Sequence, residues 1–161
     1  SVITHRCRAQ EFGRAPAMRG ATLLCLLGLG VRVSLCADLT RQPRASGTPV
    51  VETVIQLIKE HRIFSDDYGL LRRIAVATSQ DGTDASTYRA GYHGGIWQVD
   101  EVDFNATQDT ASHPALASSI AQISSAFDID WDRVLWQDLQ RPLYSALAAR
   151  LHLSNLPGAI P

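Results

Sequence analysis

The sequence has little of what several large classes of protein depend on. Lysine occurs once, at Lys59, and there is no basic patch, so nothing indicates a nucleic-acid-binding protein. All three cysteines, Cys7, Cys25 and Cys36, lie within the first 36 residues. Residues 37–161 therefore contain no disulfide and no thiol nucleophile. A domain built from them must be held together by its hydrophobic core alone.

Motifs for metal and cofactor binding are also missing from the sequence. The segment 128–132 begins like a calcium-binding loop, but Arg133 stands where that loop needs Gly, and Leu139 where it needs Glu. There is no nucleophile elbow and no phosphate-binding loop. The histidines beyond residue 37 lack metal-ligand spacing; they are His61, His93, His113 and His152. We therefore expect neither a metal ion nor a cofactor.

Residues 18–36 have the pattern of a secretory signal peptide. A basic start precedes an apolar run over 21–31, which is shorter than the ~20 residues of a membrane span. The small side chains of Ser34 and Cys36 suit cleavage before Ala37. We expect a secreted, extracellular protein without membrane insertion after cleavage. The alternative reading of the apolar run is a buried helix.

The predicted cleavage divides the chain and changes its charge. Residues 1–17 lie upstream of Met18 and have a doubtful status, residues 37–48 predict a flexible lead-in, and residues 49–161 predict one domain, which we expect to be monomeric. The part after cleavage keeps ten basic and fifteen acidic side chains, a net charge of about −5. Proteins that adhere to anionic bacterial walls are more often basic, so this acidity counts against a broad antibacterial role.

Apolar residues recur at helical spacing through most of the domain and predict an all-α fold. Leu71, Ile74, Ala75 and Thr78 fall on one face, which we expect to be buried, with Thr78 pointing inward. A Gly-rich loop or small hairpin is predicted over 80–95. The predicted helices run from Thr48 to about His61, from 65–67 to about Ser79, from about Ile96 through Phe104, from Pro114 to Phe127, and from Pro142 through Leu151 to an end at 155–157.

Three blocks follow one another along these predicted helices. They are Ile74-Ala75-Val76-Ala77-Thr78-Ser79, Gly95-Ile96-Trp97-Gln98-Val99, and residues 142–153. They resemble the lytic transglycosylase and goose-type lysozyme superfamily, whose members read Ile-Ala-x-x-Glu-Ser, Gly-Leu-Met-Gln-Ile, and Pro-x-x-Asn-Ile followed by Tyr-Leu. The resemblance covers roughly residues 49–155 and implies a lysozyme-like fold. The departures are Thr78 for the Glu, Ser145 for the Asn and His152 for the Tyr.

The first departure removes the group that the family's chemistry requires. The family's Glu protonates the glycosidic oxygen of a β-1,4-linked amino-sugar polymer, and a threonine hydroxyl cannot do so. General-acid catalysis contributes roughly 10²–10⁴-fold. The resemblance therefore implies a catalytically impaired domain that binds peptidoglycan- or chitin-like polysaccharide. One alternative is an active glycoside hydrolase or lytic transglycosylase that uses Asp81 or Asp84, although both also read as turn residues. Another is a secreted interaction domain without glycan binding.

The resemblance also suggests residues that would contact the polysaccharide. Gln98 would lie in the cleft, with a surface helix position as its alternative. Gly95 would allow close backbone approach before the helix. A sequon at Asn105-Ala106-Thr107 predicts N-glycosylation of Asn105. The candidate platforms for sugar rings are aromatic residues that could equally belong to the core, namely Tyr92, Trp97 and Tyr144.

Overall fold

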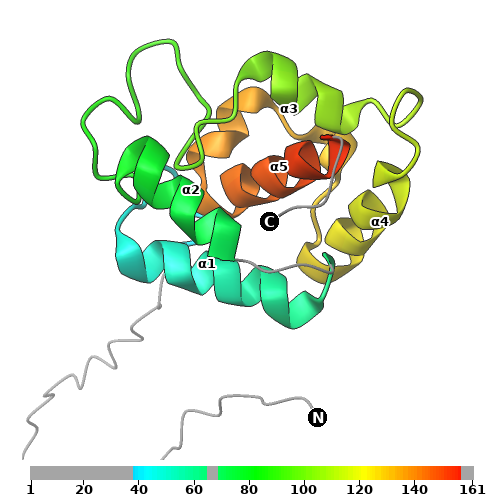
Figure 1. Cartoon of the computed structure of the whole chain (residues 1–161), viewed down its shortest axis with the longest axis horizontal. Helices are drawn as coiled ribbons and strands as arrows, with labels where there is room; N and C mark the ends of the chain where they lie inside the picture. Colours follow the sequence, from blue (N-terminus) through cyan, green and yellow to red (C-terminus); the bar gives the residue numbers. More distant parts are fainter. Residues whose placement is uncertain (1–37, 65–68, 157–161) are drawn as a thin grey trace, which may run out of the picture. The chain divides into compact units, whose positions relative to one another are not determined.

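The computed structural model describes residues 38–64 and 69–156. The chain divides into a unit of residues 1–34 and a unit of residues 35–161, and only the second contains described residues. These residues form five α-helices and two short 3-10 helices, with no strand among them (Figure 1). The prediction of an all-α fold is therefore confirmed. The elements are α1 (Thr48–His61), α2 (Gly69–Ser79), α3 (Glu101–Gln108), α4 (Leu116–Phe127), η1 (Trp131–Arg133), η2 (Trp136–Gln140) and α5 (Pro142–Asn155).

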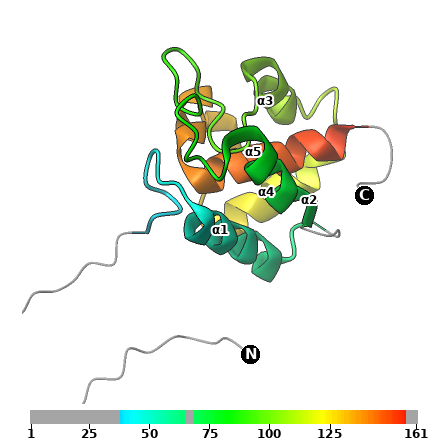
Figure 2. The ribbon, with the colours of Figure 1, turned by 60° about the vertical axis from the view of Figure 1, so that its left-hand side comes forward.

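Helix α5 is the centre of the fold. It contacts α1, α2, α3, α4 and η2, and Figures 1 and 2 show the other helices arranged around it. A helix surrounded in this way must be buried on most of its circumference. Nine consecutive or nearly consecutive positions of α5 are buried, and many have small side chains that let neighbouring helices approach closely: Pro142, Leu143, Ser145, Ala146, Leu147, Ala148, Ala149, Arg150 and Leu151.

Helix α1 follows its sequence pattern closely. Pro49 lies in the first turn, where its missing N–H costs nothing, and the apolar residues Val51, Val54 and Ile58 are fully buried on one face. The helix ends after His61, where Arg62 adopts a left-handed conformation with φ of 51°. Both predicted ends of this helix are confirmed.

The segment before α1 is folded, which corrects the prediction of a flexible lead-in over 37–48. The carbonyl oxygen of Thr40 accepts a hydrogen bond of 2.8 Å from the backbone N–H of Leu143, and the N–H of Arg44 donates one of 2.8 Å to Gln140. The guanidinium of Arg41 donates to the carbonyl oxygen of Phe127, at the end of α4, over 2.6 Å. Turns anchored in this way have no apolar periodicity, so the sequence pattern did not reveal them.

The helix predicted from Ile96 begins five residues later, at Glu101. Gln98 has a φ of 53°, a left-handed conformation that interrupts any helix, and Asp100 is the N-cap residue. Residues 80–100 accordingly form a chain of turns rather than a hairpin. Helix α4 starts at Leu116, two residues after the predicted Pro114. The predicted start of the second helix at 65–67 lies outside the described residues, and α2 is described from Gly69.

Trp131 joins α3 to the segment that follows α4. Its ring packs edge-on against Phe104 with ring centroids 5.9 Å apart, and its indole N–H donates to the hydroxyl of Thr107 over 3.1 Å. Trp131 and Thr107 are both fully buried. Trp131 is thus a core anchor, as predicted, whereas Trp136 is only half-buried and donates to the carbonyl oxygen of Val99.

Replacing Thr107 with Val should destabilise the domain by about 1–3 kcal/mol, because the Trp131 indole N–H would stay buried without an acceptor while the side-chain shape is kept. Exposed Asn105 on the same helix provides the control, and Asn105→Gln should change stability by less than about 0.5 kcal/mol. Urea unfolding followed by tryptophan fluorescence measures both. Equal stabilities of the two variants would contradict the importance of this hydrogen bond.

Candidate functional site

The three sequence blocks, far apart along the chain, meet in space. The Thr78 hydroxyl, in the last turn of α2, lies 2.9 Å from the carbonyl oxygen of Ile74 and 3.1 Å from that of Ile96. The second block is thereby joined to the first. The Ser145 hydroxyl in α5 donates to the carbonyl oxygen of Gly94 over 2.9 Å, which joins the third block to the residue that precedes the second.

Beside these junctions lies a hollow of about 200 Å³. It is bounded by α2, by the turn that follows the Gly-Gly pair, by α3 and by α5. Its volume is below the ~300–1,000 Å³ typical of sites for drug-sized ligands, so it suits one small ring or group. The lining residues are Ile74, Trp97, Gln98, Val99, Asp103, Ala149, His152 and Leu153.

The Gly-Gly turn is held against η2 and α5 at a distance that permits no side chain. Gly95 has a φ of 66°, and a Cβ atom there would lie 2.0 Å from the carbonyl oxygen of Leu139. Ser145 is completely buried and also accepts a hydrogen bond of 3.2 Å from the backbone N–H of Trp97. The expectation of close backbone approach at Gly95 is confirmed. Ser145, which departs from the family's Asn, is thus the anchor of this turn, a role that its place in the sequence did not indicate.

Thr78 is exposed, which corrects the expectation that its side chain points inward. Leu71 and Ala75 on the same predicted face are buried, but the last turn of α2 extends past the edge of the core. Ser79 is the inward residue instead. It is 1% exposed, and its hydroxyl accepts a hydrogen bond of 2.9 Å from the N–H of Gly82.

Asp81 is a buried structural carboxylate. Both of its oxygens accept hydrogen bonds from the guanidinium of Arg72, and one also accepts a bond of 2.6 Å from the hydroxyl of Thr48 at the start of α1. Its own carbonyl oxygen accepts the N–H of Gly47 over 2.7 Å. These bonds tie α1, α2 and the following loop together. A carboxylate engaged in this way is committed to the fold, and removing it would leave the guanidinium of Arg72 with Glu52 as its remaining carboxylate partner.

Asp84 is a half-exposed turn residue. One carboxylate oxygen accepts hydrogen bonds from the hydroxyl of Ser86 at 2.6 Å and from its backbone N–H at 2.8 Å. These bonds lower the pKa of Asp84 from its ordinary value. A general acid needs the opposite shift, because it must keep its proton near neutral pH. Neither of the two aspartates named in the sequence analysis therefore has the environment of a general acid.

Gln98 lines the hollow, but its amide group is already engaged. The amide nitrogen donates to the carbonyl oxygen of Gly95 over 2.6 Å, and the amide oxygen accepts a hydrogen bond of 2.9 Å from Arg89. The side chain thus holds the loop closed around itself. The alternative, a surface position on a helix, is wrong, since residue 98 lies in a turn.

The candidate aromatic platforms have different environments. Trp97 is buried, and its indole N–H donates to the carbonyl oxygen of Leu71 over 2.9 Å. Tyr92 is half-buried beneath the guanidinium of Arg89, which lies 3.6 Å from the ring centroid. Burial, followed by the hydrogen bond and charge of Asp100, raises the pKa of Tyr92 to about 12. Tyr144 is half-buried, with the guanidinium of its neighbour Arg141 5.3 Å from its ring centroid. Trp97 lines the hollow of about 200 Å³ although it is buried, whereas Tyr92 and Tyr144 are not among the lining residues.

Two polar side chains at the rim of the hollow differ from all of these. His152 in α5 and Asp103 in α3 approach each other, with 3.8 Å between the imidazole Nδ1 and a carboxylate oxygen. That distance is too long for a hydrogen bond. In the sequence His152 stands out only as a departure from the family pattern, and no motif indicates Asp103 as part of a site. The two residues belong to different helices, and no local sequence signal connects them.

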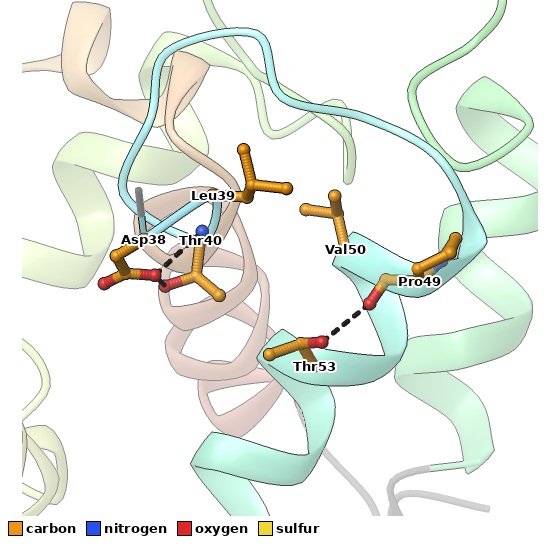
Figure 3. Close-up of a pocket in the computed structure, with 6 residues that line it drawn as sticks. All are labelled: Asp38, Leu39, Thr40, Pro49, Val50 and Thr53. Carbon is orange, nitrogen blue, oxygen red and sulfur yellow. Dashed lines mark hydrogen bonds between the residues drawn. The ribbon is translucent and has the colours of Figure 1, made fainter. Parts of the chain in front are cut away.

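A second hollow, of about 270 Å³, lies between the folded segment before α1 and α1 itself (Figure 3). Its polar groups satisfy one another: Asp38 accepts hydrogen bonds from the N–H and hydroxyl of Thr40, and Thr53 donates to the carbonyl oxygen of Pro49. The remaining surface is formed by apolar atoms such as those of Leu39. This hollow therefore offers no reactive group.

Other features bear on the candidate site. Among the residues that the structure describes, no group of three or more metal-ligating side chains is present. No helix within 38–64 or 69–156 has the length and apolar character needed to cross a membrane. Asn105 is exposed on α3, whereas Thr107 of its sequon is buried in the core.

Comparisons of the chain with protein-family models, curated proteins and solved structures found no match.

The Gly-Gly turn provides a sharp stability test. Gly95→Ala should cost at least about 3 kcal/mol, because the added methyl group meets the backbone of Leu139 and the residue must keep a left-handed conformation. Gly91 also has a left-handed φ, of 73°, but a Cβ there would meet nothing within 4 Å. Gly91→Ala should therefore cost only about 1 kcal/mol. Thermal unfolding of both variants tests this, and similar losses would refute the close docking.

Proposed function

We propose that this chain is a secreted, lysozyme-like domain that binds β-1,4-linked amino-sugar polysaccharide without cleaving it efficiently. The observation that supports this most is the meeting of the three family-like blocks around one hollow. A chance likeness along the sequence gives no reason for its parts to converge in space. The binding partner is a peptidoglycan- or chitin-like chain, the domain acts as a monomer, and it needs no metal, cofactor or nucleic acid.

The chemistry of the site accounts for the lack of cleavage. Glycoside hydrolysis requires a carboxylic acid that keeps its proton near the scissile oxygen. At the corresponding position the Thr78 hydroxyl bonds to the carbonyl oxygens of Ile74 and Ile96. Of the nearby carboxylates, Asp81 is held by Arg72 and Thr48, and the hydrogen bonds that Asp84 accepts from Ser86 lower its pKa. The alternative of an active glycosidase using either aspartate therefore has less support than binding alone.

The remaining alternative is an interaction domain with no affinity for glycans. A variant in which the hollow is blocked distinguishes this alternative from the proposed function. Leu153 lines the hollow, and Leu153→Trp would fill it, whereas Val102, 79% exposed on α3 and outside the lining, gives the matched control Val102→Trp.

We expect the full chain to be retained by insoluble peptidoglycan or chitin and to cause no loss of turbidity in a cell-wall suspension. Leu153→Trp should reduce the retained fraction by at least about tenfold, because the hollow is closed, while Val102→Trp should match the natural chain. Co-sedimentation and turbidity measure the two properties. Absence of retention by either polymer would favour the interaction domain, and rapid clearing would favour the active enzyme.

Restoring the acid by Thr78→Glu should produce cell-wall clearing only at acidic pH. The position is exposed, so the new carboxyl should keep a pKa near 4.3, and at pH 7 only about one molecule in 500 would hold the proton. This low protonated fraction at pH 7 cancels much of the ~10²–10⁴-fold rate increase that general-acid catalysis contributes. At pH 5 about one molecule in six would be protonated. Turbidity assays from pH 4 to pH 8 measure the profile, with Thr78→Gln as the control. Inertness throughout would mean that further catalytic features have been lost.

A further inference from the structure

Polar groups around the hollow of about 200 Å³ are nearly all engaged within the protein. The Trp97 indole N–H and the Gln98 amide each have a hydrogen-bond partner. Within the described part of the chain, the Asp103 carboxylate and the His152 imidazole have no hydrogen bond, only their mutual approach of 3.8 Å. Their side chains are 45% and 28% exposed, respectively, and both line the hollow. They are the groups that remain for a ligand.

The spacing of this pair favours one kind of ligand group. An oxygen atom placed between them lies within hydrogen-bonding distance, about 2.8 Å, of both the imidazole Nδ1 and the carboxylate oxygen. With the proton on Nδ1, the imidazole donates and the carboxylate only accepts. The bridging oxygen must therefore accept one hydrogen bond and donate another. A hydroxyl group does both, whereas an ether, carbonyl or carboxylate oxygen cannot donate.

The rest of the hollow suits the body of a sugar ring. Ile74, Val99 and Leu153 supply apolar surface, which complements the C–H groups on the face of a pyranose. The volume of about 200 Å³ limits the occupant to about one ring. An apolar floor with a hydroxyl-binding pair at its edge therefore favours the end or a single unit of a polysaccharide over a long segment.

We propose that Asp103 and His152 together hold one hydroxyl of a sugar ring seated in this hollow, and so determine which saccharides bind. This inference rests on the proposed glycan-binding function and adds the residues that recognise the sugar. Both residues are specificity determinants rather than catalytic groups.

The test is a double-mutant cycle on the full chain, with a chitin trisaccharide as the probe and isothermal titration calorimetry as the measurement. Asp103→Ala and His152→Ala should each weaken binding by about three- to tenfold, the contribution of one hydrogen bond. The double variant should bind about as weakly as either single variant, because both residues hold the same hydroxyl. Glu101→Gln, exposed on the same helix, is the matched control and should leave affinity unchanged.

The possible failures are distinguishable. Binding by the natural chain that neither substitution weakens would overturn the role of this pair and leave the proposed function standing. Additive losses in the double variant would mean that the residues act on separate groups, which also refutes the shared hydroxyl. No binding by the natural chain to chitin or peptidoglycan oligomers would overturn both proposals. Circular dichroism of each variant confirms that the fold is intact, as expected for side chains at the rim.

Discussion

The architecture depends on the docking of the turn-forming loop 80–100 onto the buried helix α5. Residues 80–100 contain no helix or strand; turns within the segment pair some of their backbone groups, and others need partners from elsewhere. Ser145 provides one set from the centre of α5, and Gly47 and Thr48 provide another by donating to Asp81 at the junction of α1 and α2. With both ends of the loop fixed, Gln98 closes its middle. The position of α3, and with it one wall of the hollow, follows from these bonds.

The same bonds distinguish the polar groups that stabilise the fold from those that remain available to a ligand. In a domain without disulfides, buried polar side chains that are fully satisfied give specificity to the packing. Asp81, Ser79 and Ser145 serve this purpose and are therefore unsuited to chemistry on a ligand. Asp103 and His152 contribute no such bond. Polar groups that the fold does not need are the ones available to bind a ligand.

The helices were predictable where the signal was local. The Pro residues at the starts of α1 and α5 and the apolar spacing between them determine those helices to within a residue or two. Spacing also placed Thr78 on the face of Leu71, but it cannot show where the surrounding core ends, and so the exposure of Thr78 was missed. Gln98 adopts a left-handed conformation in a turn that its own amide closes and that Ser145 contacts through Trp97; local spacing does not encode these bonds, which explains the misplaced start of α3.

The candidate site was predictable only in part, for the same reason. The three blocks identified the region, and the close approach at Gly95 followed from its residue type. The partners of Asp81 are Arg72 in α2 and Thr48 in α1. Its structural role could therefore not be predicted from the turn sequence around it. The pairing of Asp103 with His152 likewise exists only after α3 and α5 have packed.

The burial of Thr107 has a consequence for the order of events during biosynthesis. Attachment of a glycan to Asn105 requires that the sequon threonine be accessible to the modifying enzyme. In the folded domain that hydroxyl is covered and bonded to the indole of Trp131. Any oligosaccharide on this asparagine must therefore be added to the nascent chain before the tryptophan segment, which is synthesised later, reaches α3.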